Sequence, residues 1–301
     1  MADTIAVAVP RKGRPLEAVL ERIANRVGAT EVADEIISTL RYEKALTKGN
    51  QEDDRDVYER LSAYSDLVHD HRPEYTLLRD DRAGMPRRVV FDSVTVSADG
   101  FDVQLVGREE PFRALRTHSF ALGFDSADLV LEEVVGLRPE PLSNIADVNA
   151  RIDPHDTDVR VVTGLGDTVY HTLMAKPNVL DGHDADGATR EFIDDYSGPL
   201  CISPRYERLV EAVLGTDAVA DVEFCYPPAG EEEEAAIADV GVGVYLTMTG
   251  STARDYGLEL GTRLFPSETV LMENVAESTP GVDVVKELFT EADLDTELAV
   301  Q

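Results

Sequence analysis

The sequence is poor in cysteine and in long apolar runs, and it contains no tryptophan. Its two cysteines, Cys201 and Cys225, are too few for a disulfide framework. Apolar stretches such as Val240 to Leu246 are far shorter than the roughly 20 residues that a membrane-spanning helix needs. The N-terminus shows no charged segment followed by an apolar one, as a secretory leader would. We therefore expect a soluble, cytoplasmic protein.

Basic residues are also scarce. Lys and Arg total 28 against 59 Asp and Glu, which gives a net charge of −31, and only five of the basic residues are lysine. A chain this acidic lacks the basic surface that a nucleic-acid backbone requires, and an anionic membrane would repel it. A composition with few lysines and many carboxylates resembles that of proteins adapted to high intracellular salt. Molar salt screens charges to within about 3 Å. We expect neither nucleic acid nor membrane as a partner.

The order of the predicted elements indicates an α/β fold. The 301 residues, 43% of them hydrophobic, suffice for one large or two medium domains. A short strand and a helix that stops at Gly28 open the chain, and further strands alternate with helices. We expect largely parallel sheets. The expected strands cover residues 4–9, 160–162, 168–173, 199–202, 222–225 and 240–246, and the expected helices cover 15–27, 110–117, 128–135 and 206–214.

Two segments interrupt this alternation. Residues 31–81 are heavily charged with an apolar stripe at helical spacing, which predicts a helical insertion or lid. A β element with a tight turn at Ala98 to Gly100 is expected after it, between residues 88 and 106. Residues 181–189 are polar and glycine-rich, which predicts a loop.

The segment Val240 to Leu258 carries the most specific chemical signal. An apolar strand is followed by Thr249, Gly250, Ser251 and Thr252, and then by a helix. A glycine in such a turn frees backbone N–H groups, hydroxyls add donors, and the start of the helix adds partial positive charge. This pattern predicts a phosphate-binding turn, although the same residues can simply cap a helix.

The run from Thr249 to Leu258 resembles the signature turn and helix of the ATP phosphoribosyltransferases of histidine biosynthesis. Other segments resemble the same family in the same order. They are the opening strand with its Lys-Gly-Arg turn at 12–14, the stretch 106–133 with Gly123 and Asp128, the segment 202–206, and the strand 268–274.

The resemblance implies a two-lobed α/β fold of the type II periplasmic-binding-protein kind, with a ligand cleft between the lobes. The first lobe would comprise residues 1–143 and 267–301, including the charged insertion, and the second lobe residues 144–266 with the phosphate turn.

The resemblance also implies a reaction. Family members join N1 of ATP to C1′ of phosphoribosyl pyrophosphate, with Mg²⁺ on the departing pyrophosphate. Alignment of the reactants and neutralisation of the leaving group would supply most of the catalysis. Thr247 and the turn 249–252 would bind the phosphoribosyl group, whereas Lys12, Gly13 and Arg14 would face pyrophosphate or the phosphates of ATP. ATP and phosphoribosyl pyrophosphate are thus the expected partners.

The chain departs from the family at the ribose site. The family has an aspartate four residues before the threonine of the turn, and this chain has Tyr245 there. A phenol can bind a hydroxyl but is uncharged at neutral pH. Where the family has Gly-Ser-Val-Glu, this chain has Glu231 to Glu234, and Glu232 stands by spacing where the ribose-binding glutamate would be. No catalytic residue is assigned.

These departures favour a second hypothesis, a non-catalytic paralogue that binds a nucleotide or phosphosugar as a sensor or regulatory subunit. Glu231 to Glu234 can equally be a solvated helix start, and Lys12 and Arg14 ordinary surface cations. The residues at 69–71 and 181–186 suggest a metal site but lack further ligands at a known spacing, so we interpret them as exposed loops.

Two further expectations concern regulation and an alternative use of the fold. The 27 residues after Asn274 are too few for the histidine-binding domain of the family's long form, so feedback control would be absent or reside in a partner. A homo-oligomer also fits this interpretation. A solute-binding module ranks lowest, because no export segment is evident.

Overall fold

The computed structural model describes residues 3–66, 68–69, 71–79, 87–137, 142, 144–181, 187–228 and 231–290, and they form two compact units. The first unit contains the chain up to Ser126, Pro154–Asp167 and the described residues from Thr269 on. The second contains Ala127–Asp153 and Thr168–Glu268. Each unit has its own sheet, which confirms the predicted two-lobed α/β class.

The first unit is built on a seven-stranded sheet in the order β2-β3-β4-β1-β5-β12-β6. Central β1 is parallel to β4 and β5, and the remaining neighbours are antiparallel. The strands are β1 (Asp3–Pro10), β2 (Glu74–Arg79), β3 (Arg87–Ala98), β4 (Phe101–Arg108), β5 (Leu122–Ser126), β6 (Val159–Gly164) and β12 (Thr269–Asn274).

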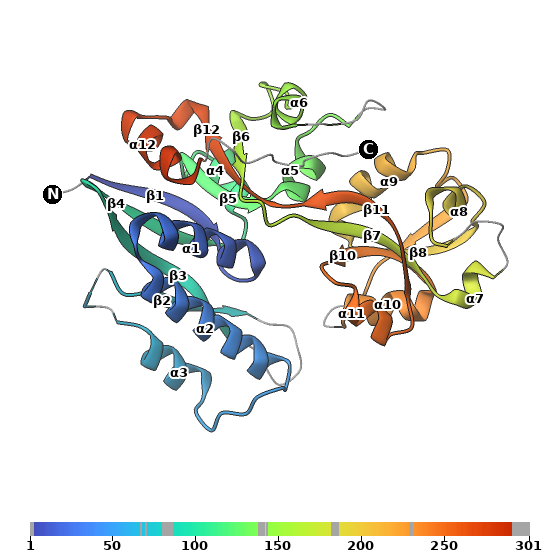
Figure 1. Cartoon of the computed structure of the whole chain (residues 1–301), viewed down its shortest axis with the longest axis horizontal. Coiled ribbons are helices and arrows are strands. Elements are labelled where there is room, and N and C mark those ends of the chain that lie inside the picture. Colours follow the sequence, from blue (N-terminus) through green and yellow to red (C-terminus); the bar gives the residue numbers. More distant parts are fainter. Residues whose placement is uncertain are drawn as a thin grey trace. The chain divides into compact units, whose positions relative to one another are not determined.

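Helices of the first unit cover this sheet (Figure 1). They are α1 (Arg14–Val27), α2 (Thr30–Thr47), α3 (Val57–Tyr64), α4 (Pro111–Arg116), the short η2 (Val275–Glu277) and α12 (Pro280–Phe289). Helix α1 buries Leu16, Leu20 and Ile23 at helical spacing, and it ends at Gly28 in the left-handed conformation, as predicted.

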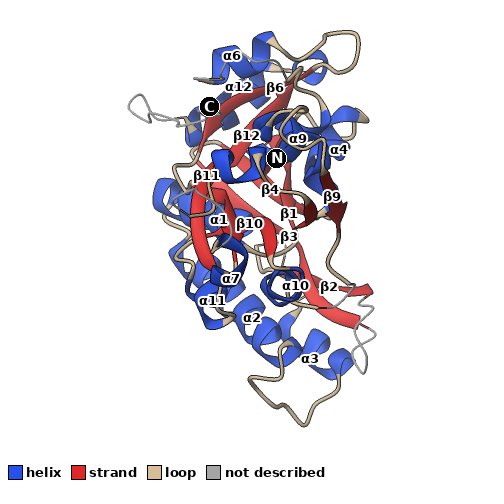
Figure 2. Ribbon diagram, turned by 90° about the vertical axis from the view of Figure 1, so that its right-hand side faces the viewer, coloured by secondary structure: helices blue, strands red, loops and turns tan. Residues whose placement is uncertain are grey.

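The charged segment 31–81 is only partly helical. Helices α2 and α3 form there, but Glu74–Arg79 is strand β2, which pairs with β3 and lies beside α3 (Figure 2). A wholly helical insertion was therefore the wrong prediction. Tyr75 in β2 is buried, so the strand contributes to the sheet's packing as well as to its hydrogen bonds.

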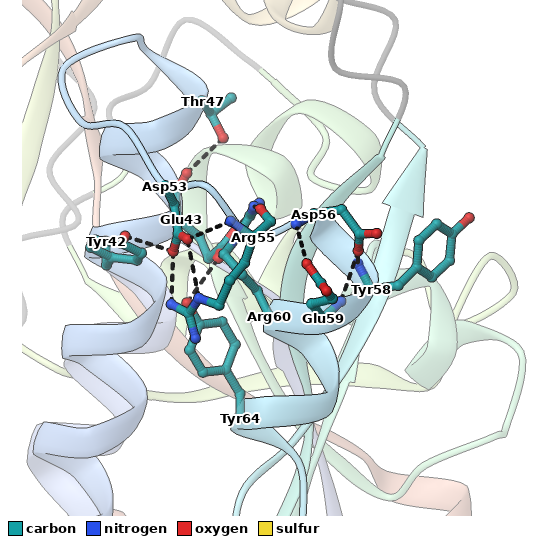
Figure 3. A network of polar contacts seen from close by, with 10 residues as sticks. All are labelled: Tyr42, Glu43, Thr47, Asp53, Arg55, Asp56, Tyr58, Glu59, Arg60 and Tyr64. Carbon is teal, nitrogen blue, oxygen red and sulfur yellow. Dashed lines mark hydrogen bonds and ion pairs between the residues drawn. The ribbon is translucent and has the colours of Figure 1, made fainter.

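A polar network holds α2 to α3 (Figure 3). Glu43 of α2 is 3% exposed and accepts hydrogen bonds from Arg60 Nε (2.7 Å) and the Tyr64 hydroxyl (3.1 Å) of α3. In the intervening loop, Asp53 accepts from the Tyr42 hydroxyl at 2.8 Å, and a capping box starts α3. The buried carboxylate is thus fully engaged, so the insertion is a packed part of this unit.

The second unit is built on a five-stranded sheet in the order β11-β7-β10-β8-β9. Strand β10 runs antiparallel to β7 and parallel to β8, so its C-terminal end and the start of β7 meet at one edge. The strands are β7 (Val169–Ala175), β8 (Gly198–Ile202), β9 (Val222–Cys225), β10 (Val242–Thr247) and β11 (Glu259–Ser267).

Helices pack against several strands of this second sheet. Helix α10 packs on β8 and β10. Helices α5, α9 and α11 contact β11. The helices are α5 (Ala127–Glu133), α6 (Ile145–Ala150), α7 (Pro177–Leu180), α8 (Arg190–Asp194), the short η1 (Pro204–Tyr206), α9 (Glu207–Leu214), α10 (Glu233–Val240) and α11 (Ser251–Asp255). Under α5, buried His171 of β7 pairs with buried Asp128 at 2.8 Å.

The prediction of largely parallel sheets was wrong. Only four of the ten strand pairings between named strands are parallel. A tight turn at Gly100 (φ 91°) makes β3 and β4 an antiparallel hairpin, and β12 enters the first sheet antiparallel to both neighbours.

The division of the chain differs from the predicted lobes because β6 pairs with β12 in the first sheet, while α5 packs on β11 in the second unit. Most of the predicted loop at 181–189 lies outside the described residues. Among the helices that the structure describes, none has the length and apolar character to cross a membrane.

Candidate functional site

The turn between β10 and α11 requires glycine at its second position. Gly250 has φ 69°, in the left-handed region that non-glycine residues rarely adopt. A Cβ atom there would lie 2.1 Å from Leu260 Cδ1 of β11, far inside van der Waals contact. Conformation and close approach therefore both select glycine, and they fix the path of the turn.

This turn presents hydrogen-bond donors to solvent. The first amide that bonds back along the helix is that of Arg254, to the Gly250 carbonyl at 3.1 Å, so the amides of residues 251–253 are not used within α11. The Ser251 amide donates instead to the Thr249 hydroxyl at 3.4 Å. Thr249, Ser251 and Thr252 are exposed, and the first two hydroxyls lie 3.0 Å apart. Backbone amides and hydroxyls collected in this way can bind a phosphate group.

Tyr245 lies on β10, half-buried, on the face of the sheet covered by α10. Burial, together with the charges of Glu233 and Glu234 and a hydrogen bond to Glu233, raises the pKa of its hydroxyl. The phenol therefore stays protonated at neutral pH. Glu233 is thus the carboxylate that is hydrogen-bonded to this phenol.

Glu232 occupies the N-cap position of α10 and is exposed. Its carboxylate accepts a hydrogen bond at 3.3 Å from the hydroxyl of Tyr256, the residue that follows α11. This contact brings the start of α10 next to the turn-and-helix segment 249–256. A carboxylate, a phenol and the phosphate-type turn are thus gathered on one part of the second unit.

A pocket of about 350 Å³ lies beside the turn, toward β7 and β11. Hydroxyl groups line it from the start of β7, from the end of β10 and from the turn: Thr168, Tyr170, Thr172, Thr247 and Thr249. Two guanidinium groups complete the polar lining, Arg254 of α11 and Arg263 of β11. The volume is at the lower end of the range for small-molecule sites.

The Lys-Gly-Arg turn lies in the first unit, between β1 and α1. Gly13 has φ 81° and is the N-cap of α1. Arg14 is paired with Asp167 and also donates to the Asp167 carbonyl at 2.7 Å, while the same carboxylate accepts from the Thr269 hydroxyl at 2.7 Å. Lys12 is more exposed and lies 4.0 Å from Glu109. Arg14 is therefore positioned by a carboxylate, and Lys12 extends toward solvent.

Comparison with known proteins identifies the family. The model of the halobacterial ATP phosphoribosyltransferase family matches residues 1–300. The chain belongs to this family. No curated protein matches the chain. The family assignment agrees with the resemblance carried by the turn 249–252 and its following helix.

Solved structures of low identity are also similar to the chain. The ATP phosphoribosyltransferase HisG:HisZ complex of Thermotoga maritima is 14% identical with a TM-score of 0.42, and the match covers 94% of each chain. The periplasmic VFT2 domain of Bordetella pertussis BvgS is 10% identical with a TM-score of 0.43, covering 96% of this chain and 88% of that one. YhfZ from Shigella flexneri is 8% identical with a TM-score of 0.46, covering 96% and 85%.

The structure of this family member gathers most of the predicted site residues. Tyr245 and Thr247 end β10, the turn 249–252 follows, and Glu232 is joined to the same region through Tyr256. Lys12, Gly13 and Arg14 form their own turn in the first unit. No role in the site was predicted individually for Arg254, Arg263 or Glu233.

The missed residues had weak signals in the sequence. Arg254 stands inside the recognised segment, but its direction depends on where α11 packs. Arg263 lies in an irregular part of β11, where alternation along a strand does not predict the side that a residue faces. Among the described residues, no group of three or more His, Cys, Asp or Glu side chains is arranged to hold a metal ion.

Proposed function

We propose that this chain catalyses transfer of the phosphoribosyl group from phosphoribosyl pyrophosphate to N1 of the adenine of ATP. A bond forms between N1 and C1′, the bond from C1′ to the pyrophosphate oxygen breaks, and pyrophosphate leaves with the electron pair. Membership of the family supports this reaction, since the family match covers residues 1–300. The observation that carries the proposal in the structure is the glycine-dependent turn 249–252.

In this proposal the turn binds the 5′-phosphate of the sugar. The amides at the start of α11 and the exposed hydroxyls of Ser251 and Thr252 supply neutral donors to the dianion. Neutral donors suit a chain of net charge −31, because the phosphate oxygens then need no nearby lysine. Molar salt screens the remaining carboxylates over about 3 Å.

The second set of anion-binding groups is Lys12 and Arg14, which we assign to pyrophosphate or the phosphates of ATP. Asp167 fixes the position of the Arg14 side chain, and a guanidinium has the planar fork geometry that suits an oxyanion. The phosphoribosyl substrate would enter as its Mg²⁺ complex, because Mg²⁺ binds substrate phosphates readily and keeps several waters. The metal then neutralises the leaving pyrophosphate.

A kinetic comparison tests the role of the turn. Thr252→Val removes a hydroxyl from the turn, and Thr216→Val removes one from an exposed position elsewhere in the second unit. We expect Thr252→Val to raise the KM for phosphoribosyl pyrophosphate about tenfold, because a hydrogen bond to a charged group contributes about 1.5–3 kcal/mol. Thr216→Val should leave it unchanged. Equal KM values for both variants and the wild type would remove the turn from the substrate site.

A second candidate function rests on Tyr245. Its pKa is raised, so it stays neutral and cannot favour a cationic sugar as the family's aspartate would. This observation favours a non-catalytic paralogue that binds a nucleotide or phosphosugar as a sensor or regulatory subunit. If the wild type is inactive, activity gained by Tyr245→Asp but not by Tyr245→Asn would identify a decayed enzyme. If the wild type is active and Tyr245→Asp changes nothing, the aspartate is dispensable.

We place the activity in the cytoplasm, where histidine biosynthesis and its phosphorylated substrates are found. Assembly into a homo-oligomer, or with a regulatory partner, is part of the same proposal. Light scattering of the purified chain in molar KCl, with and without histidine, tests whether the chain forms a homo-oligomer. A monomer under both conditions would refute the homo-oligomer.

A further inference from the structure

The two cysteines of the chain lie opposite each other on neighbouring strands of the second sheet. Cys201 is in β8 and Cys225 is in β9, and they are direct partners in the parallel register. Neighbouring strands lie about 4.8 Å apart, and a disulfide bond requires Cα atoms that are about 4.4–6.8 Å apart. Directly paired residues also point to the same face of a sheet. The backbone therefore brings the two thiols within reach of a disulfide bond.

The side chains make use of this proximity. Both cysteines are free, and the Cys201 thiol donates a hydrogen bond to the Cys225 sulfur. Cys201 is 1% exposed and lies in an apolar cluster with Ala236 and Ile237 of α10. Cys225 packs against the same cluster but is partly exposed. An external reagent therefore reaches the pair through Cys225.

Burial also assigns different roles to the two thiols. It raises the pKa of the Cys201 thiol to about 12, and it raises the pKa of the Cys225 thiol as well. At Cys225 the hydrogen bond from Cys201 opposes the effect of burial, because it stabilises the thiolate. Cys225 is thus the better nucleophile, and Cys201 is the thiol that reacts second. A disulfide bond carries no charge, so it suits this apolar cluster better than a thiolate does.

Strand β9 has few contacts that attach it to the sheet. It is the edge strand in the order β11-β7-β10-β8-β9, and none of its four residues is buried. From β9 the chain continues to the start of α10, where Glu232 and Glu233 lie. A covalent bond between Cys201 and Cys225 ties this edge strand to the buried part of the sheet.

We propose that Cys201 and Cys225 form a reversible disulfide bond by exchange with a small-molecule disulfide, and that this bond tethers β9 to β8. The Cys225 thiolate attacks one sulfur of the small disulfide, which forms a mixed disulfide and releases one thiolate. The Cys201 thiolate then attacks Cys225 Sγ, and the second small thiolate leaves with the electron pair. The released thiolates take up the protons that the cysteines lose. The cysteines are thus oxidised, and the small disulfide is reduced to two thiols.

A pair of this kind responds to the redox state of its surroundings. In a reducing compartment, disulfides are usually transient and serve in catalysis or redox sensing. Neither cysteine belongs to the phosphate turn or to the Lys-Gly-Arg turn. The inference therefore stands apart from the proposed transferase reaction.

Exchange with hydroxyethyl disulfide and mercaptoethanol in molar KCl tests the proposal. These reagents are neutral, so the net charge of −31 does not repel them. The full chain, folded or unfolded in urea, is incubated at graded ratios of the two reagents and quenched with acid, and mass spectrometry then counts its thiols and disulfides. Since the chain has two cysteines, its intramolecular disulfide has one possible pairing. We expect the equilibrium constant for this disulfide to be about tenfold or more higher in the folded chain, because folding already holds the thiols together.

Two variants and one further measurement separate the steps. Cys201→Ser should accumulate the mixed disulfide at Cys225. Cys225→Ser should stay largely reduced, because its remaining thiol is buried. Circular dichroism checks that both variants fold. For the tether, the amides of residues 222–225 should exchange with deuterium about tenfold more slowly in the oxidised wild type than in the reduced wild type.

Three results would overturn the proposal. An equilibrium constant in the folded chain equal to or below that of the unfolded chain would show that the native register opposes the bond. A folded wild type that stops at the mixed disulfide would show that the Cys201 thiol does not reach Cys225 Sγ. Unchanged deuterium exchange at residues 222–225 after oxidation would show that the bond does not tether β9.

Discussion

Two glycines flanking α11 allow the geometry of the phosphate turn to be tested by a matched pair of substitutions. Gly250 and Gly257 have nearly equal φ values of 69° and 73°. An added Cβ at Gly250 meets Leu260 at 2.1 Å, whereas at Gly257 it meets nothing within 4 Å. Gly250→Ala therefore combines a conformational penalty with a steric clash, and Gly257→Ala incurs the conformational penalty alone.

The magnitudes follow from these two costs. A non-glycine residue in the left-handed region costs about 1–2 kcal/mol, and overpacking a filled site adds about 1–3 kcal/mol. We expect Gly257→Ala to lower the free energy of unfolding by about 1–2 kcal/mol and Gly250→Ala by about 2–5 kcal/mol. Urea denaturation in molar KCl, followed by circular dichroism, measures both. Equal losses in the two variants would refute the packing of Gly250 against Leu260.

Three other perturbations have expected outcomes. Glu43→Ala should lower the free energy of unfolding by about 3–5 kcal/mol, because it leaves the largely buried Arg60 without its carboxylate. The control Glu35→Ala, which removes an exposed ion pair, should lower it by less than about 1 kcal/mol in the same denaturation assay. Burial raises the pKa of the Glu132 carboxyl, so the folded state binds the carboxyl proton more tightly than the unfolded state does. The contribution of Glu132 to the free energy of unfolding therefore falls as the pH rises through its folded-state pKa. Glu132→Gln should therefore compare more favourably with the wild type at pH 7.5 than at pH 4.5 in paired urea titrations. Lowering KCl from about 1 M to 0.1 M lengthens the screening distance from about 3 to 10 Å, and the melting temperature of this −31 chain should fall.

Local features of the fold were predictable from the sequence. The helix that ends at Gly28 and the strand, turn and helix around Gly250 depend on periodicity and on glycine, which neighbouring residues determine. Strand β2 was not predictable in the same way. Its charged surroundings resemble those of the preceding helices, and only pairing with β3 distinguishes it.

The candidate site divides along the same line. The turn 249–252 is contiguous, so its sequence sufficed to predict it. The partner of Tyr245 is Glu233 because of the way α10 packs, and Arg14 meets Asp167 across more than 150 residues of chain. Arg263 reaches its pocket through the irregularity that Gly261 permits. Such placements depend on tertiary packing, and spacing along the chain does not predict them.

The most direct measurement for the proposed reaction is pyrophosphate release by the purified chain in molar KCl with Mg²⁺, ATP and phosphoribosyl pyrophosphate. The proposal predicts release that requires both substrates, accompanied by a product whose mass is that of phosphoribosyl-ATP. It also predicts that Thr252→Val requires more phosphoribosyl pyrophosphate for the same rate. Absence of release with ATP, in a protein that calorimetry shows to bind phosphoribosyl pyrophosphate, would contradict the transferase and favour the sensor.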